Sequence, residues 1–141
     1  MEYYNLKDAS DKYIEVVAQA MSLYGLFSRR KKLRTLEFFN SKLNEEDFEV
    51  EELARGYIII GSLYEEIKEY ESAAFYFNKS FSLAKNIAFP YECNFKKILK
   101  AFLKADRKDL YDYWRSDFIK RSLYDKKINK FKKRKDRVIA T

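Results

Sequence analysis

Few residues of this chain could carry catalytic chemistry. Its 141 residues include no histidine and a single cysteine, Cys93. Histidine is the side chain that most often serves as general base, metal ligand or member of a nucleophilic triad. A cysteine that no histidine activates is expected to be a small interior hydrophobic residue. Nucleophilic and histidine-dependent metal chemistry are therefore not expected.

Carboxylates are the remaining candidates for acid–base work. Glu65 and Glu66 are adjacent, but neighbouring residues of a helix point in different directions. The acid-rich segment NEEDFEVEE, residues 44–52, lacks the glycine of a calcium-binding EF-hand loop. We expect it to open a helix, because the positive end of the helix dipole favours acidic residues there. The chain also lacks a glycine-rich phosphate loop, so we predict a protein that is not an enzyme and uses no cofactor or metal.

Positive charge is concentrated at the C-terminal end. Residues 120–141 contain ten basic and two acidic residues, a net of +8, whereas residues 1–119 contain nineteen basic and twenty acidic residues, a net of −1. Apolar residues between 124 and 138 recur close to one stripe, which predicts a basic amphipathic helix. It could cap the last helical repeat, bind phosphate backbones or lie on an anionic membrane. A nucleic-acid function would use Lys126, Lys127, Lys130, Lys132, Lys133, Arg134, Lys135 and Arg137.

Long helices joined by short turns must position these residues. Three glycines and one proline, with abundant Lys, Glu, Leu, Phe and Tyr, favour an all-α fold. Apolar spacing predicts seven helices, with Ser10 capping the first and Asp106 with Asp109 opening the sixth in a capping-box-like arrangement. The expected helices are 10–27, 30–43, 48–67, 71–87, one from Pro90 to about 104, one from about 106, and 117–136.

The sequence predicts a cytoplasmic protein. Its longest stretch without a charged residue is 16–28, 13 residues, whereas a membrane span needs about 18 or more. The N-terminus has no basic segment followed by an apolar run, so no secretory signal is expected. One cysteine cannot form an internal disulfide bond.

Residues 56–77, GYIIIGSLYEEIKEYESAAFYF, place small residues inside strongly helical, aromatic-rich sequence. Two packed helices lie about 8–10 Å apart and need small side chains where they cross, so we expect Gly61 to face Ala73. The segment resembles a tetratricopeptide repeat, a helix–turn–helix unit of 34 residues. The matched positions are Tyr57, Ile60, Gly61, Tyr64, Ala73 and Phe77.

The resemblance implies a solenoid of antiparallel helix pairs. About three degenerate repeats would occupy residues 1–118, followed by a basic capping helix or tail, residues 119–141. The third pair aligns with the central pair at an offset of 37, which places Ile98 where Gly61 stands.

A narrower resemblance covers residues 38–87, through the motifs EELAR and YESAAFYFNKS. They are similar to the C-terminal repeats of Rap-type and arbitrium-type receptors, tetratricopeptide proteins of low-GC bacteria that bind short signalling peptides. The resemblance implies a bacterial regulator whose partner is a protein or a short peptide.

The first helix of each pair lines the concave surface of such repeats. By this resemblance the binding positions are Arg55, Ile58, Ser62 and Glu65 in the central pair and Glu92, Phe95, Leu99 and Phe102 in the next. Arg55 would pair with a carboxylate, and the apolar members would accept side chains or a helix of the partner.

Two readings of these positions remain open at this stage. Ile58, Phe95 and Leu99 could instead be interior residues. We predict a protein- or peptide-binding regulatory module, with a homodimer through exposed aromatic residues as a further option. The alternative function is a small helical nucleic-acid-binding protein that acts through its basic C-terminal segment.

Overall fold

A computed structural model describes residues 11–21, 24–85 and 95–121. These residues are helical apart from short turns and contain no strand, which confirms the all-α prediction. The elements are α1 (Asp11–Met21), the 3₁₀ turn η2 (Tyr24–Leu26), α2 (Arg29–Glu45), α3 (Val50–Glu66), α4 (Tyr70–Leu83), α5 (Phe95–Lys104) and α6 (Lys108–Arg121). Ser10, Pro90 and Cys93 lie outside the described residues.

The chain divides into two compact units, Met1–Tyr91 and Glu92–Thr141. We call them the N-terminal unit and the C-terminal unit. The domain boundary expected between residues 118 and 119 falls inside α6. The described part of the N-terminal unit comprises α1 to α4, and that of the C-terminal unit comprises α5 and α6.

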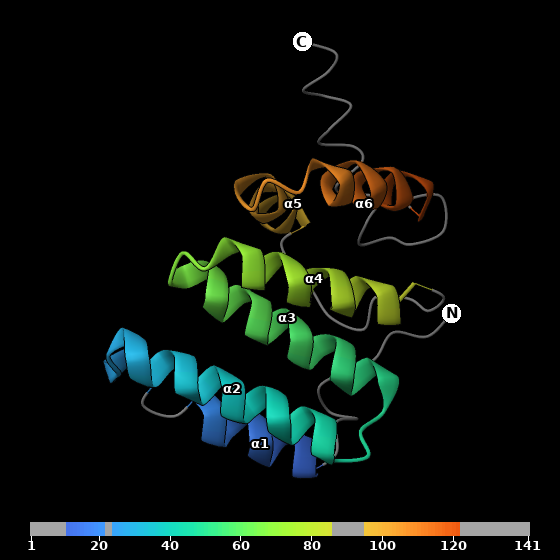
Figure 1. The fold of residues 1–141 in the computed structure, drawn as a ribbon. Helices are drawn as coiled ribbons and strands as arrows, with labels where there is room; N and C mark the ends of the chain where they lie inside the picture. The colour runs from blue at the N-terminus through green and yellow to red at the C-terminus, as the bar shows by residue number, and fades with distance from the viewer. Residues whose placement is uncertain (1–10, 22–23, 86–94, 122–141) are drawn as a thin grey trace. The chain divides into compact units, whose positions relative to one another are not determined.

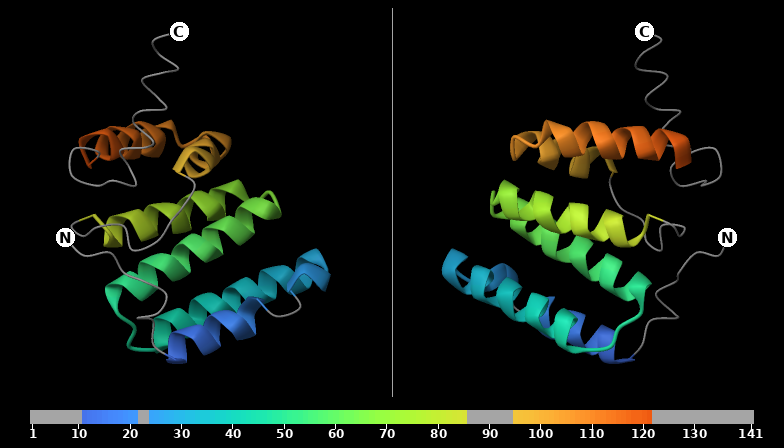
Figure 2. Two further views of the ribbon diagram at one scale, coloured as in Figure 1. Left: turned by 180° about the vertical axis from the view of Figure 1, so that it is seen from behind. Right: turned by 45° about the vertical axis from the view of Figure 1, so that its right-hand side comes forward.

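In the N-terminal unit, α2, α3 and α4 lie side by side and run in alternating directions, with α1 beside α2 (Figures 1 and 2). Glycines bring α3 close to both neighbours. A Cβ at Gly56 would lie 2.7 Å from Leu43 Cδ1 of α2, and one at Gly61 would lie 2.7 Å from Phe77 Cδ1 of α4. The hydroxyl of Ser80 in α4 also donates a hydrogen bond of 2.6 Å to the Ala54 carbonyl of α3. Small residues thus allow α3 to pack closely between α2 and α4.

The expected partner of Gly61 is therefore corrected. The three atoms closest to the place of a Cβ at Gly61 all belong to the ring of Phe77, and none to the expected Ala73. Ala73 is fully buried one turn earlier in α4, but Phe77 is the side chain large enough to fill the space that the missing Cβ leaves. Spacing along the helix predicts which face is buried, and side-chain size decides which residue makes the closest contact.

Local signals explain where the helices begin. Ser28 caps α2 by accepting a hydrogen bond of 3.4 Å from the Lys31 amide. The predicted acidic start of α3 is confirmed, because the Glu52 carboxylate accepts a bond of 3.2 Å from the Glu49 amide. The capping-box-like arrangement expected at Asp106 and Asp109 is wrong, since Asp109 instead accepts two bonds from the Arg107 guanidinium, at 3.0 and 2.9 Å.

In the C-terminal unit, α5 and α6 form a hairpin whose buried aromatic residues include Phe95, Trp114 and Phe118. The rings of Phe95 and Phe118 meet edge to face, with centroids 4.7 Å apart. The predicted start of a separate helix at 117 is wrong, because α6 continues to Arg121 with no glycine or proline to end it. The rest of the predicted 117–136 helix lies outside the described residues.

The first predicted helix, 10–27, also differs from the structure. The described part contains α1, which ends at Met21, and then the separate 3₁₀ turn η2. Gly25 lies within this turn, and a Cβ there would meet no atom of the described residues within 4 Å.

Candidate functional site

Four predicted binding residues form one strip along α3. Arg55, Ile58, Ser62 and Glu65 are separated by three, four and three positions, which places them on one side of the helix. All four are half-buried. At a rise of about 1.5 Å per residue, the strip runs for about 15 Å from Arg55 to Glu65. Isoleucine and serine thus stand between a cation and an anion.

The predicted residues of the next pair are placed differently. Glu92 lies outside the described residues, and Phe95, Leu99 and Phe102 are buried. The interior role that the sequence left open for Phe95 and Leu99 therefore describes these two side chains, whereas Ile58 is half-buried. Phe102 is buried as well. Phe102 has no exposed surface at all, so it is not a surface residue that a partner could contact.

The turns explain this difference. Lys68 and Asp106 both have positive φ, 62° and 58°. The amide after each donates to a carbonyl five residues earlier: Glu69 to Tyr64 at 2.9 Å and Arg107 to Phe102 at 2.8 Å. This is the hydrogen bond that closes a Schellman motif at a helix end. The two turns are thus equivalent at an offset of 38 and not 37.

The buried residues of α3 and α5 agree at the same offset. Tyr57, Ile60, Gly61, Leu63 and Tyr64 correspond to Phe95, Ile98, Leu99, Ala101 and Phe102, and all ten are buried. At this offset the positions that correspond to Ile58, Ser62 and Glu65 are Lys96, Lys100 and Leu103, and these three are exposed. Sequence comparison missed them because a shift of one residue turns the assigned face by about 100°.

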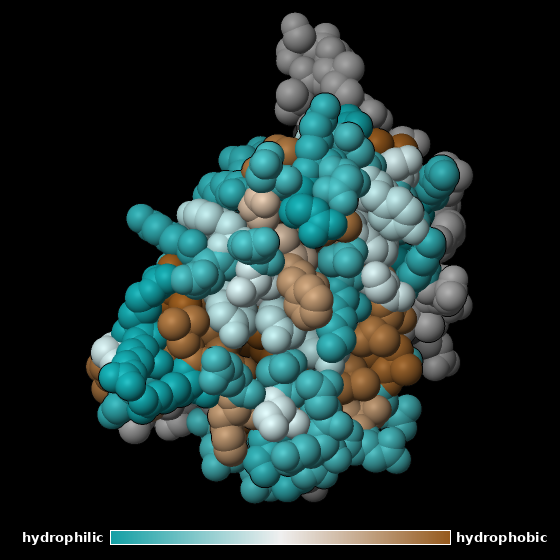
Figure 3. Space-filling model, in the orientation of Figure 1, coloured by the Kyte–Doolittle hydropathy of each residue, from teal (hydrophilic) through white to brown (hydrophobic). Residues whose placement is uncertain are grey.

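A second feature of α3 is a tyrosine cluster on another of its sides. Tyr76 of α4 stacks on Tyr57 and on Tyr64, with ring centroids 6.0 and 5.6 Å apart. The Tyr57 hydroxyl donates a bond of 2.8 Å to Asn44 of α2, and Lys79 Nζ lies 4.6 Å from the Tyr57 ring centroid. The cluster therefore ties α2, α3 and α4 together. The surface between α2 and α4 includes residues of intermediate hydropathy, drawn in white (Figure 3).

Burial raises the pKa of three tyrosines, Tyr24, Tyr64 and Tyr76. Burial, followed by the charges of Tyr76 and Glu37, raises the pKa of Tyr64 to about 12. Burial and the charge of Tyr57 raise the pKa of Tyr76, and burial and Glu66 raise that of Tyr24. All three hydroxyls stay protonated near neutral pH. They are therefore not suited to act as bases or nucleophiles.

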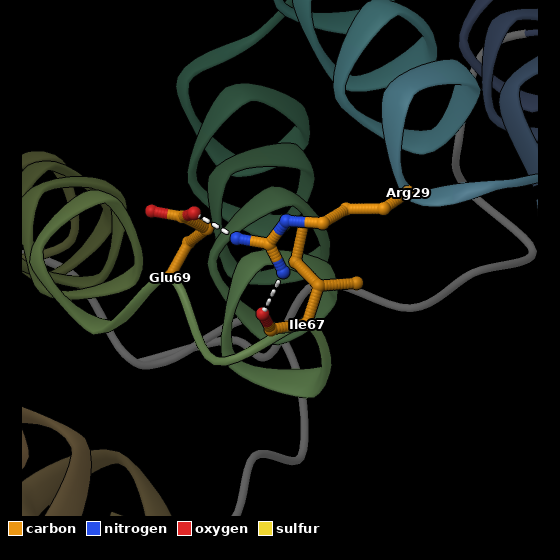
Figure 4. Close-up of polar contacts among 3 residues, drawn as sticks. All are labelled: Arg29, Ile67 and Glu69. Carbon is orange, nitrogen blue, oxygen red and sulfur yellow. Dashed lines mark hydrogen bonds and ion pairs between the residues drawn. The ribbon is translucent and has the colours of Figure 1, made fainter.

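A basic segment at the start of α2 was not singled out from the sequence. Residues 29–34 read RRKKLR and contain five cations. The Arg29 guanidinium bonds the Ile67 carbonyl at 2.7 Å and the Glu69 carboxylate (Figure 4). It thereby links α2 to the α3–α4 turn. Its neighbours Arg30, Lys31 and Arg34 are exposed.

The remaining candidates are the carboxylates, Cys93 and the basic C-terminal segment. No group of three or more His, Cys, Asp or Glu side chains there could hold a metal ion. Glu65 is half-buried and Glu66 is exposed. The eight cations assigned to the alternative nucleic-acid function, between Lys126 and Arg137, lie outside the described residues, as does Cys93. Of the basic C-terminal segment, the structure describes only Lys120, which is exposed, and Arg121, which is buried.

No protein-family model, curated protein or solved structure matches this chain. Within residues 11–21, 24–85 and 95–121, no helix has the length and apolar character required to cross a bilayer.

Proposed function

We propose that this chain is a non-enzymatic regulatory module that binds a peptide or a protein segment along α3. The observation that carries the proposal is the half-exposed strip from Arg55 to Glu65 on a helix that is already packed on two sides. Because α2 and α4 hold α3 through the contacts of Gly56 and Gly61, the strip has a fixed backbone. A rigid backbone lowers the entropy cost of binding.

The strip defines the chemistry of the partner. Arg55 offers a planar fork of donors that suits a carboxylate, and Ile58 and Ser62 offer apolar and hydroxyl contacts. About 15 Å corresponds to about five residues of an extended peptide or about ten of a helix. A short peptide with an acidic residue near one end and apolar residues beside it fits this description.

The tetratricopeptide-like arrangement belongs to the same proposal. Two helix pairs with equivalent Schellman turns, at Lys68 and Asp106, support a repeated structural unit. Repeats of this kind present the first helix of each pair to the ligand. In the C-terminal unit the corresponding exposed residues of α5 are Lys96, Lys100 and Leu103. A cytoplasmic peptide receptor or adaptor is the biological role that we propose.

Selection from a peptide library displayed on phage tests the proposal. The full chain serves as bait, and an enriched peptide is then titrated by calorimetry against the wild type and against Arg55→Ala and Ile58→Ala. Each change is expected to weaken binding at least about fivefold, the loss of 1 kcal/mol that marks a contributing contact. The matched control is Phe75→Ala, since Phe75 of α4 is 59% exposed.

Thermal melting of each variant confirms that it is folded before binding is compared. The proposal fails if no peptide is enriched. It also fails if the enriched peptides bind Arg55→Ala and Ile58→Ala as tightly as they bind the wild type.

A further inference from the structure

Among the residues that the structure describes, some of the basic residues at the start of α2 make no ion pair or hydrogen bond with their side chains. Residues 26–38 contain five basic residues and one acidic residue. Arg29 is held by Ile67 and Glu69, and Lys32 lies over the Tyr24 ring at 5.4 Å. In the described part of the chain, Arg30 and Arg34 are exposed and have neither an ion pair nor a hydrogen bond from their side chains.

Helix stability does not account for these cations. The N-terminal end of a helix carries partial positive charge, so basic residues there are unfavourable and acidic residues are preferred. The first turn of α2 has no acidic residue. Placing five cations in the first six positions therefore costs stability, and a ligand of opposite charge would remove that cost.

One exposed aromatic ring lies in the same line along α2 as two of the cations. Arg30, Arg34 and Phe38 follow one another at intervals of four residues, which places them in one line along the helix over about 12 Å. The Phe38 side chain is 45% exposed. Lys31 lies over the half-buried Phe27 ring at 5.5 Å and Lys42 over the Phe38 ring at 5.5 Å. The surface over this end of α2 is strongly hydrophilic (Figure 3).

We infer that this line of side chains, the α2 basic face, binds single-stranded nucleic acid. Arg30 and Arg34 contact phosphates, and the exposed Phe38 ring stacks on a base. Groups of cations with interleaved aromatic rings bind single strands in this way, and a base is free to stack on a protein ring only when it is unpaired. An anionic membrane fits less well because it requires a broad apolar helix face, and the line from Arg30 to Phe38 has one ring. This inference is independent of the proposed peptide site on α3.

Fluorescence anisotropy with a labelled oligo(dT) of about 20 nucleotides tests the inference on the full chain. The variant Arg30→Gln/Arg34→Gln removes two phosphate contacts. The slope of log K against log salt, measured from about 50 to 200 mM, is therefore expected to fall by about 1.4, at about 0.7 per contact for single strands. Phe38→Ala is expected to weaken binding at least about fivefold and to leave the slope unchanged.

The control variant is Lys68→Gln/Lys108→Gln, which removes the same charge from two exposed positions in other parts of the chain. It is expected to keep the wild-type slope. Equal losses in both double variants would assign binding to overall charge or to the C-terminal segment and overturn the inference. Binding to phosphatidylserine vesicles, but not to oligo(dT), that is lost in Arg30→Gln/Arg34→Gln would also overturn it, in favour of a membrane.

Discussion

Replacing the two glycines of α3 by alanine tests how closely this helix packs. At Gly61 the new Cβ lies 2.7 Å from two ring atoms of Phe77, where ordinary contact requires 3.4 Å or more. The ring must therefore shift by about 0.7 Å or more, in a site where Phe77 is 2% exposed. At Gly56 the Cβ meets the two methyl ends of Leu43, at 2.7 and 3.0 Å. A leucine end moves more easily than a phenyl ring.

The magnitudes follow from two opposing effects. Removing a glycine from a helix interior stabilises the folded state by about 1 kcal/mol, whereas overpacking costs about 1–3 kcal/mol. We expect Gly61→Ala to lower the free energy of unfolding by about 0–2 kcal/mol, and Gly56→Ala to leave it within about 1 kcal/mol of the wild type. Gly61→Leu adds three more heavy atoms at the same place and is expected to unfold the N-terminal unit.

Urea denaturation of the full chain, followed by circular dichroism, measures these changes. The critical comparison is a double-mutant cycle with Phe77→Leu, which removes the ring that the new Cβ meets. Gly61→Ala is expected to cost at least about 1 kcal/mol less in the Phe77→Leu background than in the wild type. If the free-energy changes of Gly61→Ala and Phe77→Leu are additive to within about 0.5 kcal/mol, the contact between these two residues does not limit the distance between α3 and α4.

Three further predictions concern ionisation, turns and the Arg29 link. Because the pKa of Tyr64 rises to about 12 on folding, unfolding should become easier as pH rises from about 10 to 12, and Tyr64→Phe should show a smaller loss in chemical denaturation over that range. Lys68→Gly should raise the free energy of unfolding by about 0.5–1 kcal/mol in thermal melts. Asp106→Gly should raise it by less, because aspartate tolerates positive φ better than lysine does. Arg29→Met should lower the free energy of unfolding by about 1 kcal/mol and make it less dependent on salt, because it removes the bonds to Ile67 and Glu69. Glu69→Gln should lower it by less, because it removes the ion pair alone.

Much of the fold follows from the spacing of apolar residues. The pattern predicted the helix class, and it predicted α3 and α4 to within a few residues of their ends. It succeeded because an amphipathic helix must bury one side, and that side is visible in the sequence. The acidic start of α3 was also predictable, because the helix dipole acts on residues close in sequence.

The pattern did not predict contacts between distant residues. Arg29 bonds Ile67 and Glu69, which are 38 and 40 positions away, and no local spacing indicates such a link. Nor did it predict that the atoms closest to Gly61 are those of Phe77. Both outcomes depend on the distance between helices and on side-chain size, which a helical period does not contain.

The offset between the α3–α4 pair and the α5–α6 pair shows most clearly how a small error in register moves an assigned helix face. Trp114 and Phe118 are buried like Phe77 and Phe81, an offset of 37, which is also the offset of the sequence alignment. In α5 and in the turn the offset is 38, as the equivalent positions of Lys68 and Asp106 establish.

The change of offset therefore falls after the turn, and neither turn contains the glycine that would have marked it in the sequence. When the offset of α6 is applied to α5, every assigned position is wrong by one residue, which is a rotation of about 100° around the helix. It thus selects the buried Phe95 and Leu99 in place of the exposed Lys96 and Lys100. When two helix pairs are compared, each helix needs its own alignment before its outward residues can be assigned, because the second helix of a pair does not determine the register of the first.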